Sequence, residues 1–180
     1  MWLFNLVENL LSITRLEDGR VHMNIEPQLL SDIFAEALTH LDRNACKHHI
    51  RTELPDDMLM ADMDARLMVQ VVINIVNNAI KYTPEGSHIT LSARRSGRMV
   101  AVEIADDGPG VPDEAKEKLF DRFYTAGNER GDGRRGLGLG LSLCKSIVTA
   151  HGGTIEVLDN HPRGAVFRFT LRASEVTTYE

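Results

Sequence analysis

The most regular hydrophobic pattern of the chain runs from about Leu67 to Tyr82 and has the spacing of an α-helix. Its apolar face is formed by Leu67, Met68, Val71, Val72, Ile75, Val76, Ala79 and Ile80. Asp62 or Asp64 can cap the start of this helix. A second line of residues shares another face of the same helix: Asn74, Asn78, Lys81 and Tyr82. Packing alone does not explain why two amides, an amine and a phenol align beside a buried face.

The N-terminal segments predict a helix, a strand and a second helix. Apolar positions in residues 1–17 recur with the 3-4-3 spacing of a helix that packs on another helix, and Asp18-Gly19 ends it. Residues 1–18 are therefore expected to be the end of a different module. Alternation at 21–25 predicts a short strand, and an amphipathic helix is expected from Pro27 to about His48.

The remaining pattern alternates strands and helices. Extended segments are predicted at 50–54, 58–61, 89–94, 99–105, 154–159 and 165–172, with a hairpin turn at Ser96-Gly97. A short helix is expected at 113–120, and a longer one ends at His151-Gly152-Gly153. This order predicts an α+β fold, a two-layer α/β sandwich in which helices cover one face of a mixed β-sheet.

Composition narrows the possible partners. The 180 residues carry a net charge of −6, and the basic residues are scattered, so no nucleic acid is expected as a partner. No apolar run reaches bilayer length, so the chain itself is not expected to contact a membrane directly. Cys46 and Cys144 are far apart and show no zinc-like spacing, which predicts reduced thiols.

The polar face of the central helix suits a phosphate ligand. An Asn side chain offers an oxygen to a hard cation and a donor to phosphate, and Lys supplies a positive charge. Asn78 and Lys81 can therefore meet a magnesium-bound phosphate. Asn74 fits equally well as a buried amide that packs one helix on another.

Two glycine-containing segments add to this pattern. Asp106, Gly108 and Gly110 form a DxGxG sequence after a predicted strand, where a chain can approach a ligand closely. Gly136, Gly138 and Gly140 lead into a helix whose free N-terminal amides can hold phosphate. Residues 125–135 are polar and glycine-rich, which predicts a mobile lid or a plain flexible loop. The glycine segment from Gly136 to Gly140 matches neither a Walker A loop nor a Rossmann fingerprint.

Taken in order, these features resemble the ATP-binding catalytic domain of sensor histidine kinases, the GHKL superfamily with the Bergerat fold. NIVNNAIKYTP resembles the N box, DDGPGVP the G1 box, KLFDRFY the F box and GLGLGL the G2 box. The resemblance covers about residues 20–172, and the glycine-rich region is particularly similar to the potassium-linked KdpD type. It implies a catalytic domain at 19–173, a tail at 174–180, and at 1–18 the end of a dimerization helix.

The resemblance also implies roles for individual residues. Asn78 would coordinate Mg²⁺, and Asp106 would accept a hydrogen bond from the adenine amine of ATP. Phosphate or sugar would be contacted by Asn74, Lys81 and Tyr82. Gly108 and Gly110 would let the chain pass close to the base. The lid would be hinged by Gly136, Gly138 and Gly140, which would also present amides to the phosphates. Its start would be anchored by Phe120 and Phe123. The two phenylalanines fit a plain core role equally well. Asp107 departs from the family, which often has Asn there, and adds negative charge near the site.

The implied reaction is transfer of the ATP γ-phosphoryl group to a histidine that this chain lacks. ATPase relatives place a Glu base where Asn74 stands, and a neutral amide cannot act as a base, so direct hydrolysis is expected to be slow. None of the seven histidines has the family's acceptor setting, and His48-His49 is expected to be solvated surface rather than a metal site. Expected partners are the dimerization and phosphoacceptor domain and a response regulator, in the cytoplasmic part of a membrane-associated bacterial sensor. Two alternatives remain: a stand-alone GHKL serine kinase or ATPase, and a non-catalytic nucleotide-binding or protein-interaction module.

Overall fold

The computed structural model describes residues 2–20, 22–122, 124 and 139–175. Its helices are α1 (Trp2–Glu17), α2 (Leu30–Leu38), α3 (Ala65–Tyr82), α4 (Asp113–Lys116) and α5 (Gly140–Ala150), with 3-10 helices η1 (Arg43–Lys47) and η2 (Lys118–Phe120). Its strands are β1 (Glu26–Leu29), β2 (His49–Glu53), β3 (Met60–Met63), β4 (His88–Ser96), β5 (Met99–Asp106), β6 (Ile155–Asp159) and β7 (Ala165–Arg172).

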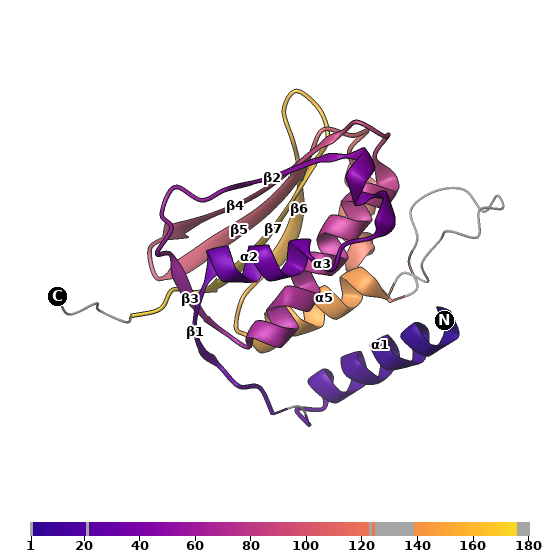
Figure 1. Cartoon of the computed structure of the whole chain (residues 1–180). Coiled ribbons are helices and arrows are strands. Elements are labelled where there is room, and N and C mark those ends of the chain that lie inside the picture. The colour runs from indigo at the N-terminus through magenta and orange to yellow at the C-terminus, as the bar shows by residue number, and fades with distance from the viewer. Residues whose placement is uncertain (1, 21, 123, 125–138, 176–180) are drawn as a thin grey trace.

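One mixed sheet organises the chain. Its strand order is β2-β4-β5-β7-β6, and only the β2–β4 pair is parallel. Helices α2, α3 and α5 lie on one face of this sheet (Figure 1). The expected α+β sandwich, with helices on one face of a mixed sheet, is therefore confirmed. The hairpin at Ser96-Gly97 is also present, with Gly97 at a φ of 63°.

The two faces of the sheet differ as the alternation predicts. Ile89 and Leu91 of β4 and Phe169 of β7 are fully buried beneath the helices. On the opposite face, the guanidinium of Arg168 contacts Glu103 on β5 at 2.9 Å and Glu156 on β6 at 3.4 Å. The open face is thus covered by cross-strand ion pairs rather than by a second layer of helices.

Helix α3 is bounded by an aspartate cap at its start and a proline just beyond its end. The Asp64 carboxylate accepts a hydrogen bond from the Leu67 amide at 3.3 Å, so Asp64 rather than Asp62 is the N-cap. The helix ends at Tyr82, and Thr83 is extended before Pro84, because proline disfavours helical geometry in the residue before it. The predicted apolar face is buried from Met68 to Ile80.

The N-terminal predictions need correction. The strand lies at Glu26–Leu29 rather than at 21–25, where the described residues are not in a strand, and it pairs with β3 as a separate two-stranded sheet. Since Pro27 lies in this strand, the helix expected from Pro27 to His48 is reduced to α2. The chain then turns into η1, where the Asp42 carboxylate accepts from the Asn44 amide at 2.9 Å. This local cap competes with continuation of the helix.

Helix α1 lies along α5 (Figure 1). Ile13 of α1 is fully buried, Leu16 packs against the core, and Glu17 forms an ion pair with Arg122. The predicted helix is therefore present over Trp2–Glu17 and packs on the rest of the fold. Among the described residues, no helix is both long and apolar enough to cross a bilayer.

His151 joins the two helices that border the candidate site. It is the C-cap of α5, and its Nδ1 donates to the Ile147 carbonyl at 2.7 Å. Its Nε2 accepts from the backbone amide of Asp64 at 3.1 Å, at the start of α3. His151 as a residue is only 9% exposed, and both bonds lie in the buried interior. The predicted position at the helix C-terminus is confirmed, and its role extends to fixing α3 against α5.

We expect His151→Phe to lower the free energy of unfolding by about 1–3 kcal/mol, because the Asp64 amide loses its acceptor in a buried position. Urea unfolding monitored by circular dichroism measures this change. His40→Phe is the control, because the exposed His40 side chain, just beyond the end of α2, pairs only with Glu36 on that helix. Equal midpoints for the wild type and His151→Phe would contradict the assigned role.

Candidate functional site

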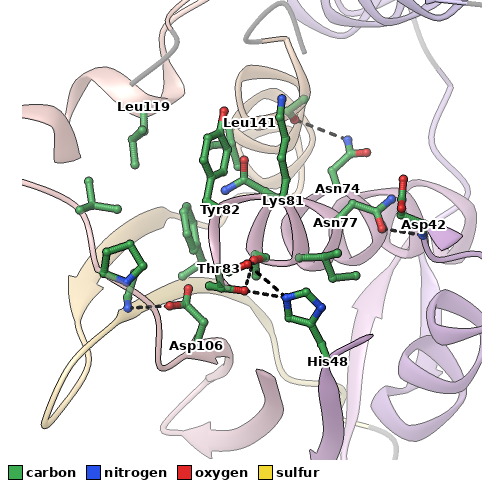
Figure 2. A pocket seen from close by; sticks show the side chains of 18 of the residues that line it. Asp42, His48, Asn74, Asn77, Lys81, Tyr82, Thr83, Asp106, Leu119 and Leu141 are labelled. Carbon is green, nitrogen blue, oxygen red and sulfur yellow. Dashed lines mark hydrogen bonds between the residues drawn. The ribbon is translucent and has the colours of Figure 1, made fainter. Parts of the chain in front are cut away.

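A cavity of about 890 Å³ opens between α3, η1, the loop after β5 and the start of α5 (Figure 2). It is within the size range of pockets for small organic ligands. The predicted site residues that line it are Asn74, Asn78, Lys81, Tyr82, Asp106, Gly110 and Gly140. Segments that are far apart in the sequence therefore meet at one cavity.

The polar face of α3 forms one side of this cavity. The Asn74 side chain accepts from Gln70 at 2.9 Å and donates to the carbonyl of Gly140 at 3.5 Å, so it bridges α3 and α5. Asn78 is half-buried and makes no side-chain hydrogen bond with any residue that the structure describes. Its amide therefore differs from that of Asn74 in being available to a ligand.

Lys81 and Tyr82 lie at the cavity end of α3. The Lys81 ammonium is 5.3 Å from the centre of the Tyr82 ring, and Tyr82 is 44% exposed. Both side chains rise from α3 beside Leu141 of α5 (Figure 2). A cation and an aromatic ring thus border the cavity on the side opposite Asp106, a pairing suited to an anionic ligand with a planar part.

Asp106 is the buried carboxylate of the site. Its Oδ1 accepts from the amides of Gly108 at 2.9 Å and Ala165 at 3.3 Å. No described residue donates a side-chain hydrogen bond to Oδ2. The carboxylate is therefore held in one orientation by the backbone, with one oxygen available to a hydrogen-bond donor in the cavity.

Burial raises the pKa of Asp106 above its ordinary value, and the two backbone donors offset only part of this effect. The negative charge of the adjacent Asp107 raises the pKa further. The ionised carboxylate is therefore less favourable in the folded chain than in the unfolded chain. Such a group gains from a ligand that donates a hydrogen bond to it.

Asp107, the departure noted in the sequence, points away from the cavity. Its carboxylate accepts from the His88 amide at 2.8 Å and lies 3.0 Å from Nδ1 of the His88 ring. Partial burial acts to raise the pKa of Asp107, but the hydrogen bonds and charge of His88 hold it below its ordinary value. The charge of Asp107 is thus matched by a partner on β4 instead of facing a ligand.

Gly108 and Gly110 allow the loop after β5 to turn tightly. A Cβ on Gly108 would come within 2.5 Å of the Thr83 methyl group. Gly110 has a φ of 81°, in the region that favours glycine, and lines the cavity. Gly108 itself does not line the cavity, so its role is close packing beneath Asp106.

Helix α5 presents its N-terminus to the cavity. The Leu143 amide donates to the Leu139 carbonyl at 2.9 Å, the first such bond of α5 among the residues that the structure describes. The amides of Gly140 and Leu141 precede it, and both residues line the cavity. This is the arrangement expected for phosphate binding. Gly136, Gly138 and the predicted lid lie outside the described residues.

The two phenylalanines are only partly described. Phe120 is 7% exposed and contacts Phe167 edge to face, with ring centres 6.3 Å apart. Phe167 lines the cavity, whereas Phe120 does not. Phe120 therefore supports the wall from behind, in agreement with the core alternative. Phe123 lies outside the described residues.

Several cavity residues were not predicted from the sequence. His48 Nε2 lies 3.0 Å from the Thr83 hydroxyl, which itself donates to the Ala79 carbonyl at 2.7 Å. Asn77 accepts from the Asp42 amide at 2.9 Å and fixes η1 against α3. Only Thr83, within the KYTP sequence, carried a local signal. The contact of His48 with Thr83 and that of Asn77 with Asp42 each join residues more than thirty positions apart.

The side chains of His48 and His49 turn to different partners. His49 is exposed and stacks on His88, with ring centres 4.9 Å apart, while His48 turns to Thr83. Within the described part of the chain, no three His, Cys, Asp or Glu side chains are grouped to bind a metal ion.

Comparisons with known proteins agree with this geometry. Residues 63–175 match the family described as histidine kinase-, DNA gyrase B- and HSP90-like ATPase. Sensor protein KdpD of Clostridium acetobutylicum is 39% identical over 170 residues, which cover 94% of this chain and 19% of that protein. The chain thus spans about a fifth of this curated relative.

Solved structures give the same result. The catalytic domain of histidine kinase ThkA, in a nucleotide-free form, matches with a TM-score of 0.71 and 29% identity, covering 83% of this chain and 97% of that domain. ThkA in complex with response regulator protein TrrA matches with a TM-score of 0.72 and 26% identity, covering 95% of this chain and 49% of that one. The chain therefore belongs to the histidine kinase-, DNA gyrase B- and HSP90-like ATPase family, as an ATP-binding catalytic domain of the sensor histidine kinase type.

Proposed function

We propose that this domain binds Mg-ATP in the described cavity and transfers the γ-phosphoryl group to a histidine on another segment or domain. The observation that carries the proposal is the contrast between two amides on α3. The Asn74 side chain bonds Gln70 and Gly140, whereas the Asn78 side chain has no hydrogen bond to any described residue. Asn78 can thus bind a phosphate-bound cation, while Asn74, one turn earlier, is a neutral amide that cannot act as a general base.

The adenine end of the nucleotide would face Asp106. Oδ1 is occupied by backbone donors, so Oδ2 is left to accept from the exocyclic amine of adenine. Guanine presents a carbonyl oxygen at that position and would be repelled. The phosphates would reach Lys81 and the backbone amides at the start of α5, and Tyr82 would contact phosphate or sugar.

The donor set fits Mg²⁺ held between protein and phosphate. Mg²⁺ usually binds through one or two protein oxygens, with the remaining positions filled by water and phosphate. Asn78 supplies such an oxygen, and the described residues contain no all-protein metal cage. When bound, Mg²⁺ would neutralise charge on the phosphates, while Asn78 and Lys81 orient them.

The carboxylates that line the cavity are poorly suited to activate water. Asp42 caps η1 through Asn44, Glu85 pairs with Lys47 at 3.0 Å, and Asp106 is held by backbone amides. With Asn74 in the place of the ATPase glutamate, no carboxylate of the described residues is free beside Asn78. Without a general base, hydrolysis is expected to be slow and the phosphoryl group is kept for an incoming imidazole.

The wider context of the chain is part of the proposal. Helix α1 would be the end of the dimerization helix that carries the acceptor domain, with the catalytic domain at 19–173. ThkA, a relative in fold and sequence, was solved with a response regulator, which supports a response regulator as the partner of the full-length kinase. We place this domain on the cytoplasmic side of a membrane-associated sensor.

The reaction is tested with the longer protein that includes the acceptor helices and γ-labelled ATP. We expect label on the protein that is acid-labile and base-stable, as phosphohistidine is, with little free phosphate. Steady phosphate release without protein label would instead favour the ATPase alternative. Nucleotide binding with neither product would favour the non-catalytic module.

We expect Asn78→Ala to weaken Mg-ATP binding by about tenfold or more, because the cation loses its protein ligand. Calorimetric titration with a non-hydrolysable ATP analogue, with and without Mg²⁺, measures the effect. Asn77→Ala is the matched control, since that amide bonds only the Asp42 backbone and its loss should leave the metal dependence intact. Unchanged metal-dependent binding in Asn78→Ala would exclude it as the ligand.

Asp106→Asn should separate binding from stability. The variant keeps an oxygen for the two backbone amides but replaces the acceptor oxygen with a donor, so its preference for ATP over GTP should fall by about tenfold or more. Because the folded-state pKa is raised, wild-type stability falls as pH rises from about 3.8 through the raised value. The variant lacks this loss, so it should unfold at an equal or higher urea concentration at pH 7. A less stable variant with unchanged preference would contradict both expectations.

We expect Asp107→Asn to leave the affinity for Mg-ATP within about twofold, since the Asp107 carboxylate contacts His88 and does not line the cavity. Its exposed ion pair should contribute less than about 1 kcal/mol to stability. Calorimetry and urea unfolding of the same preparation measure both quantities. A tenfold gain in affinity would show that the Asp107 charge acts on the nucleotide after all.

A further inference from the structure

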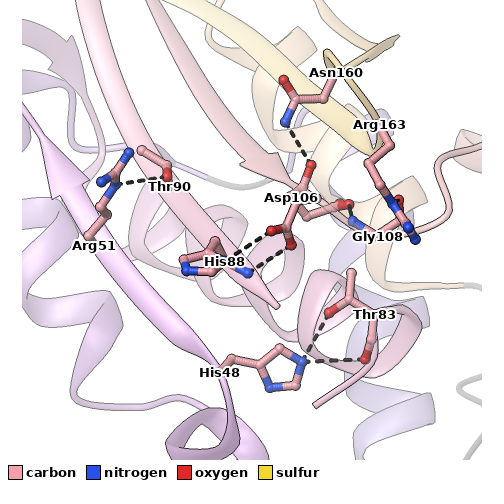
Figure 3. A network of polar contacts seen from close by, with 10 residues as sticks. His48, Arg51, Thr83, His88, Thr90, Asp106, Gly108, Asn160 and Arg163 are labelled. Atoms are coloured by element: carbon pink, nitrogen blue, oxygen red, sulfur yellow. Dashed lines mark hydrogen bonds and ion pairs between the residues drawn. The ribbon is translucent and has the colours of Figure 1, made fainter. Parts of the chain in front are cut away.

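The loop between β6 and β7, residues 160–164, packs directly on the loop that carries Asp106 (Figure 3). The side-chain amide of Asn160 donates to the backbone carbonyl of Asp106 at 2.7 Å. The Nε of Arg163 donates to the backbone carbonyl of Gly108 at 3.1 Å. Two side chains of this loop thus hold two backbone carbonyls, one at the end of β5 and one in the loop that follows it.

The contact between these loops leaves no room for a side chain at Gly164. A Cβ on Gly164 would lie 1.9 Å from the Asp106 carbonyl oxygen, and Gly164 has a φ of 106°. A Cβ on Gly110 would lie 3.1 Å from the Gly164 carbonyl oxygen. The backbones therefore touch, and the amide of Ala165, next to Gly164, reaches Oδ1 of Asp106 at 3.3 Å.

The Asn160 side chain is fixed at both ends. Its Oδ1 accepts from the His161 amide at 2.9 Å, so its nitrogen must face the Asp106 carbonyl. The backbone amide of Asn160 donates to the Gly164 carbonyl at 3.0 Å and closes the loop. An aspartate here would keep the bond from His161 but would place an oxygen against the Asp106 carbonyl oxygen.

We propose that Asn160 and Arg163 are positioning residues for base recognition: they hold the backbone of Asp106 and Gly108 so that Asp106 Oδ2 meets the exocyclic amine of adenine. This inference rests on the proposed binding of ATP. It adds the β6–β7 loop, which lies outside the four sequence motifs, to the determinants of nucleotide specificity. Neither side chain lines the cavity, so both act through Asp106.

The test compares the dissociation constants of Mg-bound non-hydrolysable analogues of ATP and GTP for the whole chain. The ratio of the two constants reports base recognition and is insensitive to a general loss of binding competence. We expect Asn160→Asp to lower the GTP-to-ATP ratio by about tenfold, and Arg163→Ala to lower it by a smaller factor. His161→Asp is the control, because it adds the same charge at the neighbouring exposed position and keeps both Asn160 bonds.

The outcomes are distinguishable. A lowered ratio in Asn160→Asp with the control at the wild-type ratio supports the proposal, as does a lowered ratio in Arg163→Ala if Asn160→Asp fails to fold. Wild-type ratios in both loop variants, beside a lowered ratio in Asp106→Asn, overturn the positioning role alone. A wild-type chain without preference for ATP would instead overturn the proposed function, and this inference with it.

Discussion

Burial of the apolar face of α3 against the mixed sheet is the constraint on which the site depends. The residues from Met68 to Ile80 on that face are inaccessible to water, so the rotation of the helix about its axis is fixed by packing. Since Asn74 and Asn78 are one helical turn apart, the same packing decides where both amides point. The chemistry of the cavity is thus set by a hydrophobic interaction on the other side of the helix.

A comparable dependence holds for Asp106. Its carboxylate lies at the end of β5, where the strand leaves the sheet, and the backbone of β7 supplies one of its two donors. Desolvation disfavours its charge, and the fold tolerates this because the cavity beside it can receive a donor ligand. Stability and recognition are therefore opposed at this residue, which is common at binding sites.

Sequence patterns predicted the elements that are long and periodic, and the residues that those elements carry. The apolar repeat in α3 and the alternation in β4, β5 and β7 predicted a helical layer on a sheet. Two of the predicted glycines, Gly110 and Gly140, line the cavity. The short strand β1 was missed because its pairing with β3 is non-local and Pro27 imitates a helix start. The contacts of His48 with Thr83 and of Asn160 with Asp106 were missed for the same reason, as each joins residues more than thirty positions apart.

Helices α3 and α5 are tied to each other near both ends of α5. Asn74 bonds Gly140 at the first residue of α5, and His151 bonds the Asp64 amide beyond its last residue. An eleven-residue helix is about 16 Å long, so the two ties are well separated and resist both sliding and rotation. The two helices are thus expected to keep their relative position as one rigid unit. If the cavity changes its size around a ligand, we expect the connecting loops to move while α3 and α5 keep their relative position.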